Sequence, residues 1–234
     1  MTKRIAIIPA RGGSKRIPNK NIRDFCGKPM IAHILQAAQE SELFDEIHVS
    51  TDSETIRETV ENLGFGIEFM RPPELADDHA PIMPVLKYVM ETYASSGRQF
   101  DQAWLLMACA PLVEPSDLQQ AAQLFDQAGG ESPVLSIAEY PAPIEWAFSR
   151  ATDGKMTPVQ PGMFSVRSQD LGKKYFDAGV FVVFPARVVM QSEGAGSDEG
   201  FIGYVIPKSN AVDIDDEADW ILAEALFRSR NIKR

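Results

Sequence analysis

The amino end of this chain combines paired glycines with a concentrated positive charge. Residues 3–23 read KRIAIIPARGGSKRIPNKNIR and contain no acidic side chain. Seven of them are cationic, namely Lys3, Arg4, Arg11, Lys15, Arg16, Lys20 and Arg23. Backbone N–H groups of a glycine-rich turn can cradle anionic oxygens, and lysine and arginine side chains neutralise their charge. The pattern therefore predicts a polyphosphate site.

This positive charge is local. The whole chain has a formal net charge of −10, so the residues outside the segment sum to −17. The alternative is a basic surface turn. The phosphate site is favoured because the cationic stretch contains no acid and directly follows the apolar run of residues 5–8. The segment has neither the Gly-Lys-Ser/Thr ending of a Walker A loop nor a GxGxxG dinucleotide motif.

A second group of chemically able residues lies near the carboxyl end, in the sequence VDIDDEAD at residues 212–219. Asp213 and Asp215 alternate around Ile214, so in an extended segment both carboxylates point the same way while Ile214 points into the core. Mg²⁺ is typically bound by one or two carboxylates together with phosphate and water oxygens. The alternative is that Asp215 or Asp216 only caps the last helix. A nearby phosphate-binding loop favours the metal.

Single polar residues give weaker signals. Arg71, in RPPELADD, suits contact with a base or an acidic substrate as well as it suits a solvated loop. Asp52 is interpreted as the cap of the following helix in preference to a ribose ligand, and the neighbouring Ser53 can also cap that helix. Arg167 and Gln169 flank Ser168, and an arginine fork suits a carboxylate, although a hydrated loop is the alternative.

Three further residues follow Arg71 in the same stretch of sequence. Asp77 and Asp78 are interpreted as loop caps in preference to catalytic acids. His79 is interpreted as a surface histidine because none of the three histidines of the chain has metal-ligand spacing.

Apolar runs and amphipathic helical patterns must position these residues. The patterns predict strands at residues 5–8, 47–50, 66–70, 104–108 and 134–138 and helices near residues 31–38, 53–63, 81–93 and 118–125. Such alternation is typical of a three-layer α/β/α nucleotide-binding fold with a mainly parallel sheet. Ligands bind beyond the carboxyl ends of such strands. We therefore expect the basic loop, Thr51-Asp52, Arg71-Pro72 and Ala110-Pro111 to line one rim.

The alternation weakens in a proline-containing stretch before the last elements. Four prolines interrupt it, at positions 141, 143, 158 and 161. We interpret residues 140–176, approximately, as an insert or arm within a single domain spanning residues 1–234. Strands are predicted again at residues 178–184 and 201–207, followed by a helix that Asp215 and Asp216 open.

Composition restricts the partners. The length of 234 residues suits one well-packed domain. The net charge of −10 argues against nucleic-acid or membrane-surface binding. The two cysteines, Cys26 and Cys109, lack metal-ligand spacing and are typical of reduced thiols, and no apolar run has signal-peptide or transmembrane length. These features predict a cytoplasmic protein.

The motifs resemble those of a known family. IIPARGGSKRIPNKNI is similar to the signature of the CMP–acylneuraminate synthetases, the cytidylyltransferases that activate nine-carbon sugar acids. The resemblance continues over nearly the full length through CGKPMIAH, VSTD, RPPELADD, APL, RSQDL, YFDAGVF and VDIDDEADW. Within the family, RPPELADDH, VRSQDL and YFDAG are most similar to the pseudaminic acid cytidylyltransferase branch.

The resemblance implies an Mg²⁺-dependent enzyme that couples CTP to a nonulosonic sugar acid, giving a CMP-sugar and pyrophosphate. It also implies a homodimer joined partly through the arm. It implies these roles by motif position: Arg11 and Lys20 as catalytic residues on the triphosphate, Ala10, Gly12, Gly13 and Ser14 beside it, Asn21 and Arg71 at cytidine, Arg167, Gln169 and Asp177 at the sugar acid, and Asp213 and Asp215 at the metal.

Departures from the family pattern fall at expected sugar contacts. Met107 stands where the acylneuraminate branch has a glutamine, and Phe176 and Val180 stand where the pseudaminic branch has histidine and glutamine. Synthesis of CMP-legionaminate, CMP-N-acetylneuraminate or CMP-3-deoxy-manno-octulosonate therefore stays open.

Two different functions are disfavoured by the same motifs. A metal-dependent glycosyltransferase usually carries its aspartates directly after a middle strand, whereas here they lie near the carboxyl end and the basic loop lies at the start. A non-catalytic nucleotide-binding regulator is disfavoured because the loop and the aspartate pair are both present. The order and pairing of the motifs favour the cytidylyltransferase.

Overall fold

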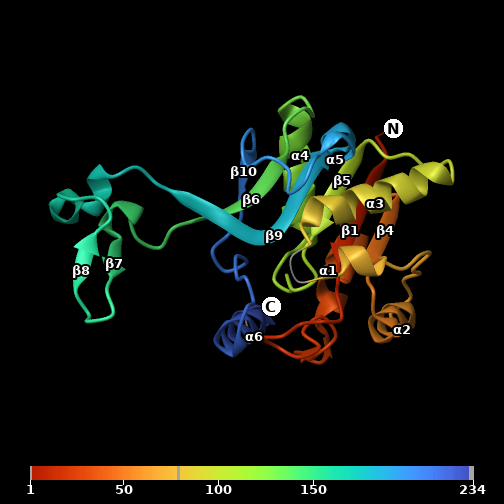
Figure 1. The fold of residues 1–234 in the computed structure, drawn as a ribbon, viewed down its shortest axis with the longest axis horizontal. Coiled ribbons are helices and arrows are strands. Elements are labelled where there is room, and N and C mark those ends of the chain that lie inside the picture. The colour runs from red at the N-terminus through yellow and green to blue at the C-terminus, as the bar shows by residue number, and fades with distance from the viewer. Residues whose placement is uncertain (1, 78–79, 232–234) are drawn as a thin grey trace.

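A central sheet organises the computed structural model, which describes residues 2–77 and 80–231 (Figure 1). The strand order is β10-β6-β9-β5-β1-β4. Its strands are β1 (Arg4–Pro9), β4 (Glu46–Ser50), β5 (Gln102–Leu106), β6 (Val134–Glu139), β9 (Tyr175–Pro185) and β10 (Ile202–Val205). β1 pairs in parallel with β4 and β5, and β10 in parallel with β6, whereas β9 is antiparallel to both neighbours. The predicted mainly parallel α/β fold is confirmed.

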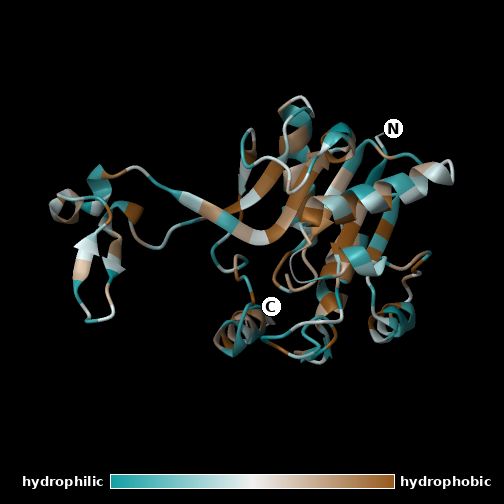
Figure 2. Cartoon of the chain, in the orientation of Figure 1, coloured by the Kyte–Doolittle hydropathy of each residue, from teal (hydrophilic) through white to brown (hydrophobic). Residues whose placement is uncertain are grey.

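Helices cover both faces of the sheet. They are α1 (Met30–Glu40), α2 (Glu54–Asn62), α3 (Ile82–Ser95), α4 (Pro115–Gln127), α5 (Ala186–Gln191) and α6 (Glu217–Asn231). Ala6 and Ile8 of β1 pack with α1, α2 and α4, while Ile5 and Ile7 pack with α3 and α5. A strand buried on both faces has a continuous apolar sequence, as β1 does (Figure 2). No helix among the described residues is long and apolar enough to cross a bilayer.

One predicted strand is wrong. Residues 66–70 form no strand in the described structure, and β4 is the last strand at its edge of the sheet. Phe69 instead stacks on His48 with ring centroids 4.4 Å apart and meets the edge of Tyr93 at 5.2 Å. The apolar pattern of this segment therefore reflects packing against α3 and not sheet pairing.

The stretch between β6 and β9 leaves the sheet as an extended arm (Figure 1). It contains a hairpin of β7 (Phe148–Arg150) and β8 (Met156–Pro158) and short 3-10 turns at η2 (Ile144–Trp146), η3 (Met163–Ser165) and η4 (Ser168–Asp170). The indole N–H of Trp146 donates to the carbonyl oxygens of Met163 and Val166, both at 3.1 Å. The Trp146 side chain thereby ties the η2 turn to the η3 turn.

A third apolar cluster joins the two ends of the chain. It consists of Ile17, Phe25, Met30, Leu112, Val212, Ile214, Trp220 and Ala223. Phe25 lies in the short hairpin of β2 (Asp24–Phe25) and β3 (Lys28–Pro29), and its ring meets Trp220 edge-on at 5.4 Å. The guanidinium of Arg23 lies 4.4 Å above the Trp220 ring. This cluster places the basic loop beside the segment that leads into α6.

His48 gives the fold a defined acid sensitivity. It is 1% exposed, and its Nδ1 lies 3.1 Å from the Tyr93 hydroxyl. Burial, with help from the charges of Arg71 and Arg98, lowers its pKa from 6.5 to about 3. The unfolded chain therefore binds a proton at His48 in a pH range where the folded protein does not, so stability falls as pH falls below 6.5.

We expect His48→Asn to reduce this sensitivity. Between about pH 7.5 and about pH 5.5 the wild type should lose about 1.4 kcal/mol more unfolding free energy than the variant, because the variant has no imidazole to protonate. Urea unfolding at both pH values and one protein concentration measures the difference. Equal losses for the two proteins would contradict a neutral buried His48.

Candidate functional site

A cavity of about 440 Å³ opens at the carboxyl ends of β1 and β5. Seven of its lining residues were expected from the sequence to bind nucleotide or metal: Arg11, Ser14, Lys20, Asn21, Arg71, Asp213 and Asp215. Lys15 and Arg16 of the basic loop also line it, as do Met107 and Cys109 after β5. The structure therefore brings residues from both ends of the chain together with residues that follow β4 and β5.

The loop after β1 is held closely against the end of β4. The amide N–H of Ala10 donates to the Ser50 carbonyl at 2.9 Å, and that of Gly12 donates to Asp52 Oδ1 at 3.1 Å. A Cβ on Gly12 would lie 2.9 Å from the Cβ of Ser53, so only glycine allows this approach. Gly13, in contrast, has open space beside it, with nothing within 4 Å of its built Cβ.

Asp52 does not cap the next helix, so that interpretation is wrong. Ser53 caps α2 instead, because its Oγ accepts from the Ile56 amide at 3.4 Å. Asp52 is left to bind the backbone of the basic loop at Gly12. Both residue types suit an N-cap, and the sequence alone could not choose between neighbours.

Asn21 joins the two ends of the basic loop. Its Nδ2 donates to the Arg11 carbonyl at 3.0 Å, and its Oδ1 accepts from the Cys109 thiol at 3.2 Å. Burial raises the pKa of Cys109 to about 12, so the thiol stays protonated and can donate at neutral pH. Sequence reasoning missed Cys109, since a cysteine without partners in sequence carries no signal for this role.

The basic loop and the carboxyl-terminal aspartates meet directly. Arg16 Nη2 lies 2.7 Å from Asp215 Oδ1, although the residues are 199 positions apart. Lys20 Nζ donates to the Ile214 carbonyl at 2.6 Å and lies 4.0 Å from Asp215. The two clusters identified in the sequence therefore share one cavity wall.

The extended segment before α6 directs the aspartates as its alternation predicts. Ile214 is fully buried in the third apolar cluster, while Asp213 and Asp215 face the cavity. Burial, and next the charge of Asp215, raise the pKa of Asp213. Asp216 caps α6 by accepting from the amides of Ala218 and Asp219 at 2.8 and 3.1 Å. The carboxylate of Asp215 is therefore not the cap.

This donor set suits a hard cation that also binds phosphate. Within the part of the chain that the structure describes, no group of three or more His, Cys, Asp or Glu could hold a metal by itself. Asp213 and Asp215 provide two carboxylates without a third ligand of these types among the described residues. A bound cation would relieve the repulsion by which Asp215 raises the pKa of Asp213. A pair of carboxylates is enough for Mg²⁺ when phosphate and water fill the other positions.

Arg71 is fixed at the end of β4. Its Nε donates to Ser50 Oγ at 3.1 Å and its Nη2 to the Ser50 carbonyl at 2.6 Å, while its amide N–H reaches the Thr51 carbonyl at 2.7 Å. Burial lowers the pKa of Arg71, yet an arginine remains charged at neutral pH. The arrangement presents a pre-positioned guanidinium to the cavity.

The residues expected at the sugar acid are not gathered there. Arg167 and Gln169 are exposed on the arm, where Arg167 Nε pairs with Asp170 at 2.9 Å. Asp177 borders a neighbouring cavity of about 900 Å³. This cavity shares Ile82 with the cavity lined by Arg11 and Asp213, which we call the nucleotide-side cavity. Within a single chain, these side chains do not line the cavity that holds Arg11 and Asp213.

The loop that follows Arg71 contributes Asp77, whose predicted role was a loop cap. Asp77 lines the nucleotide-side cavity. The predictions for Asp78 and His79 fall outside the described residues.

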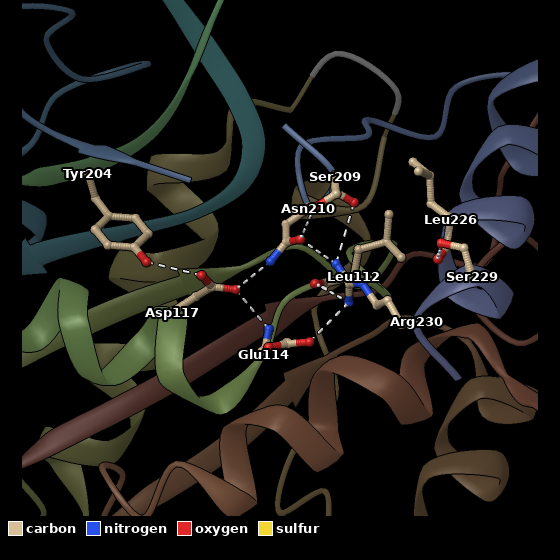
Figure 3. A network of polar contacts seen from close by, with 9 residues as sticks. All are labelled: Leu112, Glu114, Asp117, Tyr204, Ser209, Asn210, Leu226, Ser229 and Arg230. Carbon is tan, nitrogen blue, oxygen red and sulfur yellow. Dashed lines mark hydrogen bonds and ion pairs between the residues drawn. The ribbon is translucent and has the colours of Figure 1, made fainter. Parts of the chain in front are cut away.

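A buried polar network anchors the segment that carries the aspartates (Figure 3). Asp117 accepts hydrogen bonds from the Tyr204 hydroxyl, the Asn210 amide and the Glu114 backbone, each at 3.0 Å. Arg230 of α6 donates to Asn210 and lies 3.6 Å from Glu114. A fully paired buried carboxylate tolerates little displacement, so the chain after β10 is tied to α4 just before Asp213.

A mainly parallel sheet with a glycine-rich basic loop facing paired carboxylates defines a nucleotide-binding α/β protein. Comparison with known families gives the particular class: residues 5–152 match the cytidylyltransferase family model. The chain belongs to the cytidylyltransferase family, and the family expected from the motifs is confirmed.

Known relatives extend over nearly the whole chain. It is 36% identical over 226 residues to the pseudaminic acid cytidylyltransferase of Campylobacter jejuni, with 97% of each chain covered. It is 29% identical to the CMP-N,N'-diacetyllegionaminic acid synthase of Legionella pneumophila, with 95% of each covered.

Solved structures share the fold at lower identity. A CMP:2-keto-3-deoxy-manno-octonic acid synthetase complexed with CTP superimposes with a TM-score of 0.70 at 20% identity, covering 98% of this chain and 100% of that one. The 4-diphosphocytidyl-2C-methyl-D-erythritol synthase of Anaerococcus prevotii gives a TM-score of 0.62 at 13% identity, covering 97% of this chain and 96% of that one.

Substitution of Lys20 tests whether the cavity binds an anionic ligand. We expect Lys20→Met to raise the Kd for CTP about tenfold or more, because a charge-assisted hydrogen bond is worth about 1.5–3 kcal/mol. Lys3→Met is the matched control, since Lys3 belongs to the same cationic segment but does not line the cavity. Isothermal titration calorimetry measures both. Equal weakening by both variants would show a general charge effect and contradict the assignment of Lys20.

Proposed function

We propose that this protein transfers CMP from CTP to a nonulosonic, nine-carbon keto sugar acid, giving a CMP-sugar and pyrophosphate, and that the acid is pseudaminic acid. One observation carries the proposal: the cationic glycine loop and the Asp213/Asp215 pair line a single cavity. The near full-length similarity to pseudaminic acid cytidylyltransferases supports the choice of sugar.

In the proposed reaction the anomeric hydroxyl of the sugar acid attacks the α-phosphorus of CTP and gives up its proton to solvent. The bond to the oxygen bridging the α- and β-phosphates breaks, and pyrophosphate leaves with that electron pair. Such transfers depend on positioning and on charge neutralisation. Arg11 and Lys20 would offset charge growing on the leaving phosphates, and the loop backbone at Gly13 and Ser14 would lie beside them, since the Gly12 amide already donates to Asp52. Arg71 and Asn21 would hold cytidine.

Asp213 and Asp215 would hold Mg²⁺ in this proposal. When bound, the ion would polarise a phosphate oxygen and neutralise part of its charge. Arg16 pairs with Asp215 in the structure, so Arg16 would pass to a phosphate oxygen when the aspartate takes the cation.

The arm supports the further proposal of a homodimer. Arg167 and Gln169 would face the sugar acid if the arm of a second copy reaches the cavity. The arm exposes apolar side chains: Met156 by 55%, Val159 by 57% and Phe164 by 69%. A second copy would cover this surface. A cytoplasmic location is proposed with it, since the chain uses CTP in this account and both cysteines are free.

Phe164→Ser should weaken self-association, because it removes the most exposed large apolar side chain of the arm. Sedimentation velocity over a dilution series measures the change. Ile221→Ser, on the exposed face of α6, is the control and should leave the dimer unchanged. A wild type that sediments as a monomer at all concentrations would contradict the dimer.

Mass spectrometry of products tests the function. The protein is incubated with CTP, Mg²⁺ and a mixture of pseudaminic, legionaminic, N-acetylneuraminic and 3-deoxy-manno-octulosonic acids. We expect CMP-pseudaminate as the main product, its loss in EDTA and its return with added Mg²⁺. A different CMP-sugar would reassign the substrate. CTP binding without any product would favour the nucleotide-binding regulator and contradict the enzyme.

A further inference from the structure

Strand β9 carries an irregularity beside the nucleotide-side cavity. Leu135 of β6 pairs with Val182, but Ile137 pairs with Asp177. One residue of β6, Ser136, therefore faces four residues of β9, at positions 178–181. The β9 chain must bulge out of the ladder at this point, and bulges of this kind re-aim side chains and backbone near functional sites.

The bulge is fixed on both sides. The buried hydroxyl of Ser136 donates to the Phe181 carbonyl at 2.7 Å and accepts from the Phe181 amide at 3.1 Å, so it replaces the missing ladder bonds. On the other side, the Met107 amide donates to the Val180 carbonyl at 2.9 Å. The bulged backbone is thus a rigid part of the sheet.

Gly179 lies within the bulge, beside Asp213. Its φ of +65° is a left-handed conformation that favours glycine. A Cβ at this position would lie 3.3 Å from Cγ and 3.4 Å from Oδ2 of Asp213. The carboxylate of Asp213 therefore lies at the edge of the space that a side chain at position 179 would need.

Asp177 stabilises the same turn. Its Oδ1 accepts from the Gly179 amide at 2.8 Å. Its side chain borders the larger neighbouring cavity and not the nucleotide-side one, which Gly179 lines. An acceptor two residues before a left-handed glycine holds that glycine in its conformation.

We propose that Gly179 and Asp177 are positioning residues that seat the Asp213 carboxylate for the cation bound with the nucleotide. Gly179 provides the space and Asp177 fixes the turn. This role replaces the substrate contact that the sequence resemblance implies for Asp177. The inference rests on the proposed function, because it assumes that Asp213 holds a metal with CTP.

Calorimetry of CTP binding in the presence and in the absence of a metal ion separates the metal-dependent part of the affinity. The probes are CTP with Mn²⁺ and CTP in EDTA. We expect Gly179→Ala to raise the Kd for CTP with Mn²⁺ about tenfold or more, as loss of a group that orients a metal ligand typically does. The Kd for CTP in EDTA should rise much less, because Arg11, Lys20 and Arg71 are not touched. An equal rise in both would assign the effect to the added methyl group in the cavity and overturn the proposal.

Gly97→Ala is the matched control for backbone strain. Gly97 also has a positive φ, of +83°, but nothing lies within 4 Å of its built Cβ. We expect this variant to lose thermal stability as Gly179→Ala does, while both dissociation constants remain those of the wild type. If Gly97→Ala also weakens binding with Mn²⁺, strain alone explains the effect and the proposal fails.

Variants at Asp177 give a second test that does not add a side chain to the bulge. Asp177→Asn keeps an oxygen that can accept from the Gly179 amide, and we expect its Kd for CTP with Mn²⁺ to stay within about twofold of wild type. Asp177→Ala removes the acceptor and should raise that Kd several-fold. Equal loss in both would assign the role to the negative charge and overturn the proposal.

The two proposals fail in different ways. If wild-type protein binds CTP equally well with Mn²⁺ and in EDTA, the metal-dependent function itself is contradicted. If the wild type needs the metal but Gly179→Ala and Asp177→Ala match it, only the positioning role is contradicted.

Discussion

The apolar cluster that joins the two ends of the chain is the constraint on which the site depends. Ile17 of the basic loop, Ile214 between the aspartates and Trp220 of α6 are buried in one small core. Burial of large side chains of this kind is worth about 1.5–3 kcal/mol each. That driving force places the cations of the loop and the carboxylates of the last segment on one wall, although each group repels its own members.

The ion pairs across this wall do not hold it together. Arg16 and Asp215 are 66% and 43% exposed at the side chain, and exposed pairs contribute little to stability. The buried contacts hold the wall more firmly. The Asp117 network ties the chain after β10 to α4, and the β9 bulge lies beside Asp213. Such exposed charges suit the proposed exchange, in which Arg16 would pass to a phosphate oxygen and Asp215 to a cation.

Sequence patterns predicted the charged motifs of the site better than the contacts that hold those motifs in place. The basic loop and the paired aspartates were found because their charge and alternation are local properties that survive into the fold. Residues 66–70 were misassigned, because packing of Phe69 on His48 imitates strand periodicity. The roles of Asp52 and Cys109 depend on contacts with residues that lie far along the chain, at Gly12 and Asn21. No local pattern reports such contacts.

A crystal structure with CTP and Mn²⁺, using the anomalous signal of the metal, tests the central claim most directly. We expect an Mn²⁺ bound by the carboxylates of Asp213 and Asp215 and by a CTP phosphate, with Arg11 and Lys20 on the same triphosphate. A triphosphate on the basic loop with the metal bound elsewhere, or CTP bound in the larger neighbouring cavity, would contradict it.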